Sequence, residues 1–265
     1  MLPPAARPLL ALTVVGLTAA CAAPAPITAA DSPSAAPTPP PIGVRWPATG
    51  PLFGGPPQQL GDHYCTAAVV DSPAGDVLIT AAHCVADGDG TPARTGMSFA
   101  PGYHDHTAPY GIWTVTGSAV DDPWRGHADP DHDIAFLTVQ RADGRPVQQV
   151  VGGYQLVLDP GSDTAVDAIG YPDFADDPNE RSGVTTRVSA TQLELDAHGL
   201  YDGTSGGPWL RATPNTNTNT NTNSDLDVIA VTGGREQGGL SPDISYATYL
   251  GPDAATLFQQ VSGAP

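Results

Sequence analysis

Short apolar runs separated by turn residues fill the chain from about residue 46 onward. Residues 66–70 form one such run, which ends at the turn-forming residues 71–76 before residues 77–80 resume the apolar pattern. Residues 112–115 alternate in polarity, and residues 134–139 form a continuous apolar run that is typical of a buried strand. Later candidate strands occupy residues 154–158, 165–169, 185–193, 228–232 and 244–249.

Repeated short strands of this kind predict an all-β protein built as a sandwich or a barrel. The sequence contains 30 glycines and 29 prolines, which disfavour long helices because glycine loses backbone entropy and proline removes a helical donor. One helix is predicted near the C-terminus, where Ala254, Leu257, Phe258 and Val261 can share one face. With 265 residues, the chain is long enough for one or two modest domains.

The N-terminus has the pattern of an export signal, predicted over residues 1–21. Arg7 precedes an apolar run that is too short to span a bilayer. Small residues before Cys21 resemble a bacterial lipoprotein cleavage site, although Thr18 stands where a leucine-like residue is preferred. Ordinary cleavage near residues 20–23 is an open alternative. We therefore expect a secreted, extracellular protein, either free or held at the cell surface by a lipid on Cys21, which would be its only contact with a membrane.

Two segments of low complexity interrupt the strand-like text. Residues 22–46 are rich in Ala, Pro, Ser and Thr and cannot bury enough apolar surface to fold, so they are predicted to form a disordered tether. The folded domain is then expected over residues 47–265. Within it, residues 215–223 alternate Asn and Thr, which predicts an exposed loop insertion.

Charge and cysteine content narrow the function. The net charge is −18 and the ten basic residues, all arginines, are scattered, whereas nucleic-acid binding needs a concentrated basic surface. A nucleic-acid partner is therefore excluded.

If Cys21 is removed or lipidated, the exported domain keeps Cys65 and Cys84, and an oxidising environment favours a disulfide between them. The alternative is two buried thiols. Such a disulfide would contribute roughly 3 kcal/mol to stability.

Ser205 lies in the glycine-rich segment Gly203-Thr204-Ser205-Gly206-Gly207-Pro208. A serine hydroxyl becomes a strong nucleophile only when a base removes its proton and donors stabilise the oxyanion. Glycines permit a tight turn in which the amides of Gly203 and Ser205 point together at that oxyanion. Taken alone, the segment is also consistent with an ordinary glycine-rich turn.

Two further residues fit acid–base chemistry. His83 ends the apolar segment Leu78-Ile79-Thr80-Ala81-Ala82 and precedes Cys84, so its imidazole would project from a rigid frame. Asp133 enters an apolar strand, where an isolated carboxylate is costly and needs a partner. A histidine N–H would supply that partner and fix the tautomer required of a base. Taken separately, a buried structural histidine and a turn-forming aspartate remain alternatives.

Together these motifs resemble the chymotrypsin-like (trypsin-like) serine peptidases, bacterial secreted type. The matching pieces are Thr80-Ala81-Ala82-His83-Cys84, Asp133-Ile134-Ala135 and Gly203-Thr204-Ser205-Gly206-Gly207-Pro208, in the family's chain order. The resemblance implies two antiparallel β-barrels packed together with a C-terminal helix. The first barrel would cover about residues 50–145, the second about 146–250 and the helix about 252–262.

The resemblance also implies residue roles. His83, Asp133 and Ser205 would form the catalytic triad, with the oxyanion held by the Gly203 and Ser205 amides. Substrate would contact Gly199 and the segment Thr232-Gly233-Gly234, and Cys65 would be bonded to Cys84. At two positions the sequence departs from the family pattern, which limits what the resemblance implies about activation and specificity. Thr204 stands where animal members have an aspartate, and Gly199 stands where trypsins have the aspartate that selects basic side chains.

Rival hydrolase classes fit less well. An α/β-hydrolase needs its histidine after the serine, but the last histidine is His198. A subtilisin-like triad needs its acid before His83 in the chain, and no aspartate before His83 has the local sequence of such an acid. Metal-dependent hydrolysis could draw on His104, His106, Asp131 and Asp133, but they lack metal-ligand spacing. No metal and no cofactor are therefore expected.

The predicted function is a secreted serine endopeptidase that acts as a monomer on protein or peptide substrates. The alternative from another class is a catalytically silent binding module with the same fold at the cell surface. An esterase on this fold is a lesser variant because it would use the same acyl-transfer chemistry.

Overall fold

The computed structural model describes residues 44–212 and 225–263. The predicted export signal, Cys21, residues 22–43 of the predicted tether and the Asn/Thr insertion at 215–223 lie outside the described residues. Within the described part of the chain, no helix is both long and apolar enough to cross a membrane.

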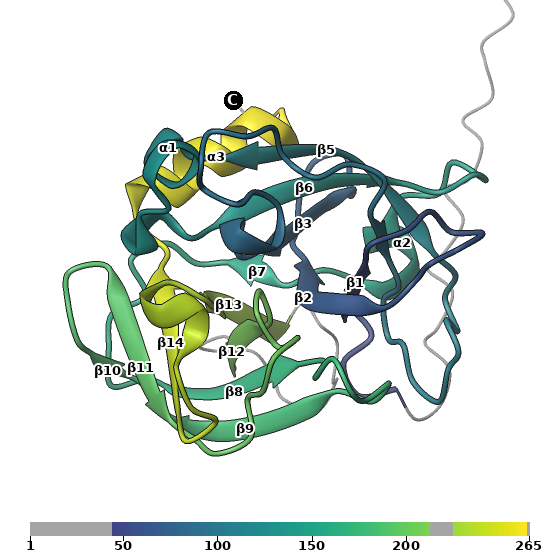
Figure 1. The fold of residues 1–265 in the computed structure, drawn as a ribbon. Helices are drawn as coiled ribbons and strands as arrows, with labels where there is room; N and C mark the ends of the chain where they lie inside the picture. The colour runs from purple at the N-terminus through teal and green to yellow at the C-terminus, as the bar shows by residue number, and fades with distance from the viewer. Residues whose placement is uncertain (1–43, 213–224, 264–265) are drawn as a thin grey trace, which may run out of the picture. The chain divides into compact units, whose positions relative to one another are not determined.

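Six strands close into the first barrel, in the order β1-β2-β3-β6-β5-β4 (Figure 1). They are β1 (Thr49–Phe53), β2 (His63–Val69), β3 (Val77–Thr80), β4 (Ser98–Phe99), β5 (Trp113–Val120) and β6 (Ala135–Gln140). The pairing of β3 with β6 matters most for function, because Thr80 lies opposite Ala135. The end of β3 and the start of β6 are therefore neighbours, and the residues just outside them meet.

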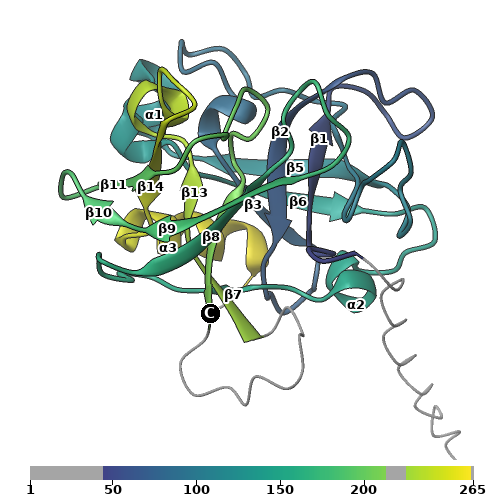
Figure 2. The ribbon, with the colours of Figure 1, turned by 90° about the horizontal axis from the view of Figure 1, so that it is seen from below.

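The remaining strands form a second, curled sheet that stays open. They are β7 (Gln155–Leu156), β8 (Ala165–Gly170), β9 (Asn179–Val184), β10 (Thr186–Arg187), β11 (Gln192–Asp196), β12 (Pro208–Ala212), β13 (Leu226–Thr232) and β14 (Ile244–Tyr249). Their order is β10-β11-β14-β13-β12-β8-β9, with β7 pairing in parallel with β13. Figure 2 shows this sheet beside the first barrel. The chymotrypsin-like, mainly β fold predicted from sequence is confirmed, with the second barrel present as a curled half-barrel.

Short helices lie between the strands, and one helix follows the last strand. They are η1 (Ala82–Cys84), α1 (Asp122–His127), η2 (Pro130–His132), α2 (Val147–Val151), η4 (Arg235–Gly238) and α3 (Pro252–Ser262). The predicted C-terminal helix is confirmed as α3, which packs on the first barrel through an edge-to-face contact between Phe258 and Phe136, with ring centroids 5.4 Å apart. The C-terminal segment thus closes one side of the barrel that carries His83 and Asp133.

Each sheet has its own buried cluster. The first barrel is filled by large side chains such as Phe99, Trp113 and Phe136, and the second sheet packs around Trp209. Packing begins within the segment predicted as a tether, because Trp46 is buried and donates its indole N–H to Glu180 of β9 at 3.1 Å. The Trp46 contact therefore joins the start of the described chain to the second sheet.

Candidate active site

Asp133 lies between η2 and β6, and its side chain is fully buried. Its two oxygens accept three N–H donors: Oδ1 accepts the His83 backbone amide at 2.8 Å, and Oδ2 accepts His83 Nδ1 at 2.8 Å and the Gly234 amide at 2.7 Å. A buried carboxylate is stable only with such partners. The structure therefore brings His83 and Asp133 together.

His83 occupies the middle of η1, directly after β3. Its ring lies beside that of buried Trp124, with centroids 6.2 Å apart, and the side chain is 12% exposed. Because Nδ1–H faces the charged Asp133 carboxylate, the proton is assigned to Nδ1, which leaves Nε2 as the acceptor. The ring is therefore held by its neighbours in one tautomer, and among the described residues no hydrogen bond to Nε2 is present.

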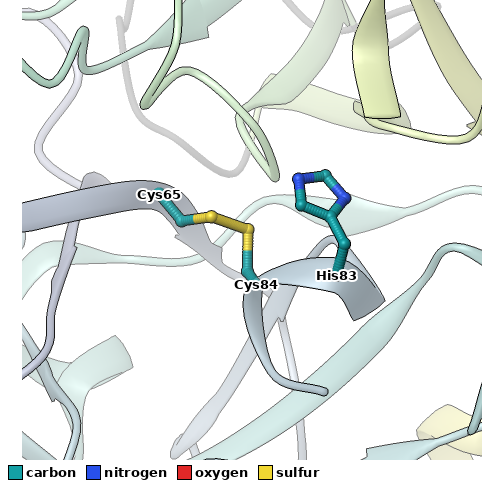
Figure 3. Close-up of side chains that lie close together, drawn as sticks. All are labelled: Cys65, His83 and Cys84. Carbon is teal, nitrogen blue, oxygen red and sulfur yellow. A yellow bond between two sulfur atoms is a disulfide. The ribbon is translucent and has the colours of Figure 1, made fainter. Parts of the chain in front are cut away.

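The disulfide between Cys65 and Cys84 confirms the predicted cysteine pairing and joins β2 to η1. Figure 3 shows the His83 ring beside this disulfide, on the same short helix as Cys84. The two sulfurs and the imidazole lie within 4.8 Å of one another. Since both sulfurs are bonded to each other and neither is a thiolate, this cluster is structural rather than a metal site.

Ser205 sits in a turn between the two sheets. Its carbonyl accepts the Thr66 amide of β2 at 2.8 Å, and the Thr66 hydroxyl donates to the Gly203 carbonyl at 3.0 Å. Gly206 has a φ of +78°, and a Cβ there would overlap Thr80 Oγ1 and the Thr66 carbonyl. The glycine signal in the sequence thus has a direct cause, because the turn must press its backbone against β2 and β3.

The two amides predicted to hold an oxyanion have no intramolecular partner within the described residues. The neighbouring amides of Thr204, Gly206 and Gly207 all donate to backbone carbonyls of the chain, whereas those of Gly203 and Ser205 do not. Stabilisation of an oxyanion requires N–H donors that have no other partner, and among the described residues these two amides meet that condition.

The hydroxyl of Ser205 faces a different group from the one the sequence analysis predicts. Its Oγ lies 3.5 Å from the carbonyl oxygen of Gln237, and no hydrogen bond joins it to His83 among the described residues. Gln237 belongs to η4, where Glu236 and Gln237 have φ values of 51° and 52°. We call residues 235–239, which pass over Ser205 here, the covering loop.

Of the residues predicted to contact substrate, Thr232, Gly233 and Gly234 lie near the Ser205 turn or Asp133, whereas Gly199 does not. Thr232 has its amide and carbonyl bonded to Gly207 and Gly206, so it braces the Ser205 turn. Gly233 lies against the carboxylate of Asp133, and Gly234 donates to it. Gly199 lies apart from these residues, since its amide donates to Pro242 and its carbonyl accepts the side chain of Asn179.

A cavity of about 280 Å³ lies next to the Ser205 turn. The sequence analysis did not select its walls, which come from three separate segments: Asp173 and Phe174, residues 200–202 and residues 239–242. The side chains of Phe174 and Leu240 are 71% and 85% exposed there, which is unusual for large apolar residues. The sequence alone carries no signal for this cavity, because the exposure of these side chains depends on how three separate segments come together.

The residues considered for metal-dependent hydrolysis are not brought together. His104 Nδ1 faces the Gly102 carbonyl at 2.9 Å, His106 pairs with Asp176, and Asp131 accepts the Thr191 hydroxyl at 2.6 Å. Asp133 is hydrogen-bonded to His83 instead.

Burial raises the pKa of the Tyr171 phenol well above its ordinary value. The phenol therefore stays protonated at neutral pH and cannot act as a base.

Comparisons with known proteins address the family and the fold. The sequence profile of the trypsin-like peptidase domain matches residues 65–215, more than half of the chain. No curated protein matches the chain. Among solved structures, the thermostable serine protease AL20 from an extremophilic microorganism is 24% identical, with a TM-score of 0.69 over 84% of this chain and 100% of that one.

Two other solved structures show the same fold. Protease Anisep from Arthrobacter nicotinovorans is 21% identical, with a TM-score of 0.69 over 83% of this chain and 97% of that one. A Glu endopeptidase in complex with MPD is 18% identical, with a TM-score of 0.64 over 84% of this chain and 95% of that one. At these identities the structural likeness establishes the fold alone.

Proposed function

Because the chain belongs to the trypsin-like peptidase domain family, we propose that it is an exported serine endopeptidase whose catalytic triad is His83, Asp133 and Ser205. The observation that carries the proposal is the buried Asp133 carboxylate, which holds both the backbone and the ring of His83 at 2.8 Å. A purely structural aspartate would not need to fix the tautomer of a histidine whose side chain is still 12% exposed.

The chemistry follows from these contacts. His83 Nε2 takes the proton of the Ser205 hydroxyl as Oγ attacks the carbonyl carbon of the substrate, and the Asp133 carboxylate stabilises the resulting imidazolium. The negative oxygen of the tetrahedral intermediate is held by the amides of Gly203 and Ser205. His83 then protonates the leaving amine, and water releases the acyl group from Ser205 by the same steps.

Substrate has to displace the covering loop. The Gln237 carbonyl lies 3.5 Å from Ser205 Oγ, so we expect a substrate carbonyl that approaches this hydroxyl to meet it. Two non-glycine residues of this loop have left-handed φ values, which cost roughly 1–2 kcal/mol each for L-residues. The observed conformation is therefore held against local strain, and a move away from Ser205 would release that strain.

Introducing glycine into the covering loop and removing glycine from it should shift the equilibrium between the covering and the displaced conformation in opposite directions. Replacing both Glu236 and Gln237 with glycine relieves the strain of the covering conformation, so Ser205 should react more slowly with a fluorophosphonate, by about three- to tenfold. Gly238→Ala should raise the rate, because Gly238 has a φ of +111° and an added Cβ would meet Thr232 Cγ2 at 3.0 Å. Equal rates in all three proteins would show that the loop does not limit access.

The proposed activity is tested by incubating the purified full chain with an unfolded protein such as casein and with a simple ester. An endopeptidase should release peptides from the protein, and His83→Ala should remove that activity. Hydrolysis of the ester alone would indicate an esterase. The absence of both from the wild type and from Gly238→Ala would favour the silent binding module, the alternative that the Ser205–Gln237 contact most supports.

A further inference from the structure

A second histidine–carboxylate cluster lies at the C-terminal end of the 3-10 helix η2, directly before Asp133. His132 ends η2, Asp121 caps the N-terminus of α1, and Asp253 lies in the first turn of α3. His132 Nδ1 is 2.6 Å from Asp121 Oδ2 and 3.8 Å from Asp253 Oδ2, and one ligand atom from each residue lies within 4.8 Å of the others. Three segments distant in sequence therefore converge on one point.

Hydrogen bonding alone does not account for this convergence. The Nδ1 atom of His132 carries at most one proton, and at 2.6 Å that proton bonds to Asp121. The second carboxylate approaches the same ring nitrogen at 3.8 Å, too far to share the bond. Two negatively charged carboxylates are thus directed at one ring nitrogen, an arrangement that a divalent ion between them would stabilise.

The spacing suits a small tetrahedral ion. With metal–ligand bonds of about 2.0–2.2 Å, the ligand atoms of a zinc site lie about 3.3 Å apart, and the two observed separations of 2.6 and 3.8 Å bracket that value. The other oxygen of Asp121 accepts the Asp122 amide at 2.8 Å, which orients Oδ2 toward His132. Fixing a ligand through its second oxygen is a common feature of metal sites.

The surroundings offer space and negative potential. The three residues line a cavity of about 200 Å³, which leaves room for water as a further ligand. Asp131 and Asp159 line the same cavity, against a single cation, Arg187. That guanidinium lies over the Tyr249 ring at 4.1 Å and donates to a backbone carbonyl, so it leaves the three-residue cluster unneutralised.

We propose that Asp121, His132 and Asp253 bind one zinc ion that ties α1, η2 and α3 together. One imidazole with two carboxylates favours Zn²⁺ over Ca²⁺, because calcium takes six to eight oxygen ligands. The ligands lie 11 and 121 residues apart in sequence, which explains why spacing motifs give no metal site. Because His132 precedes Asp133, the ion would also stiffen the segment that positions the proposed catalytic aspartate.

The test uses the full chain without a histidine tag and with Ser205→Ala, so that self-digestion does not interfere and the result is independent of the proposed activity. After removal of metals with a chelator, zinc chloride is titrated by calorimetry and the Tm is measured with and without zinc. We expect one zinc ion per chain and a Tm increase of roughly 5 °C or more at saturating zinc, with no comparable effect of calcium chloride.

Substitutions locate the site. Asp253→Asn alters a side chain that is 73% exposed, so it should leave the Tm in chelator unchanged and weaken zinc binding by about 100-fold or more. His132→Gln should weaken binding by at least as much. The matched control is His198→Gln, because His198 pairs with Asp243 at 2.5 Å but forms no three-ligand cluster in the described part of the chain. Its zinc affinity should equal that of the parent.

Three results would overturn the proposal. The first is no zinc binding at concentrations up to about 1 mM. The second is binding that survives Asp253→Asn at parental affinity, which would place the ion elsewhere even if His132→Gln fails to fold. The third is an equal loss of affinity in His198→Gln, which would indicate unspecific binding to exposed histidines.

Discussion

Replacing Ser205 with alanine should abolish peptide hydrolysis, lowering kcat on the order of 10⁶-fold. The change removes one oxygen whose nearest partner is the Gln237 carbonyl at 3.5 Å, so the fold loses no strong contact. The backbone bond from Thr66 to the Ser205 carbonyl is unaffected. The Tm of the variant should therefore stay within about 2 °C of the wild type, while kcat measured on a peptide falls to background.

A matched serine separates chemistry from general damage. Ser182 lies on β9, and its hydroxyl donates to Asp167 at 2.6 Å on the neighbouring strand. Ser182→Ala removes the same atom far from His83 and should leave kcat within about twofold. Retention of more than about one hundredth of the wild-type kcat in Ser205→Ala would exclude this serine as the nucleophile.

The second large effect is expected from Asp133→Asn, which should lower kcat by about 10⁴-fold. The asparagine side chain has one accepting oxygen and one NH₂ group, whereas both oxygens of Asp133 accept N–H donors. In one orientation, the NH₂ group of the asparagine faces the His83 backbone amide, which leaves a buried donor unpaired. In the other orientation, it faces the Gly234 amide and the His83 ring, which forces the imidazole into the wrong tautomer.

This substitution should also destabilise the fold. An unsatisfied buried donor costs roughly 1–3 kcal/mol, so we expect a lower midpoint of urea unfolding with an unchanged slope. Asp131→Asn is the control, because Asp131 loses the same charge two residues away but contacts Thr191 and Gln192 instead of His83. A kcat for Asp131→Asn as low as that for Asp133→Asn would assign the effect to local charge rather than to the His83 contact.

The sequence predicts the fold where local patterns decide it. The apolar run over residues 134–139 becomes the largely buried strand β6, and Cys65 is bonded to Cys84, as the prediction of export to an oxidising environment requires. The need of Asp133 for a partner also follows from residue chemistry, since a carboxylate ahead of an apolar strand is costly unless it is bonded.

Features that depend on contacts between segments distant in sequence could not be predicted from the sequence. The Gly234 amide, 101 residues from Asp133, completes its hydrogen bonds only because β13 ends beside β6. Likewise, the left-handed residues Glu236 and Gln237 over Ser205 have no signature in a single sequence, because neither residue type prefers that conformation. The open second sheet, and with it the cavity beside the Ser205 turn, depends on strand pairings that periodicity does not specify.

The most direct measurement of the triad is the intact mass of the purified chain after reaction with a fluorophosphonate, followed by peptide mapping of the adduct. An activated serine predicts a single adduct on the peptide that contains Ser205, and its rate of formation should fall by about 10³-fold or more in His83→Ala. An adduct on another residue, or one on Ser205 that forms equally fast without His83, would contradict a catalytic triad of His83, Asp133 and Ser205.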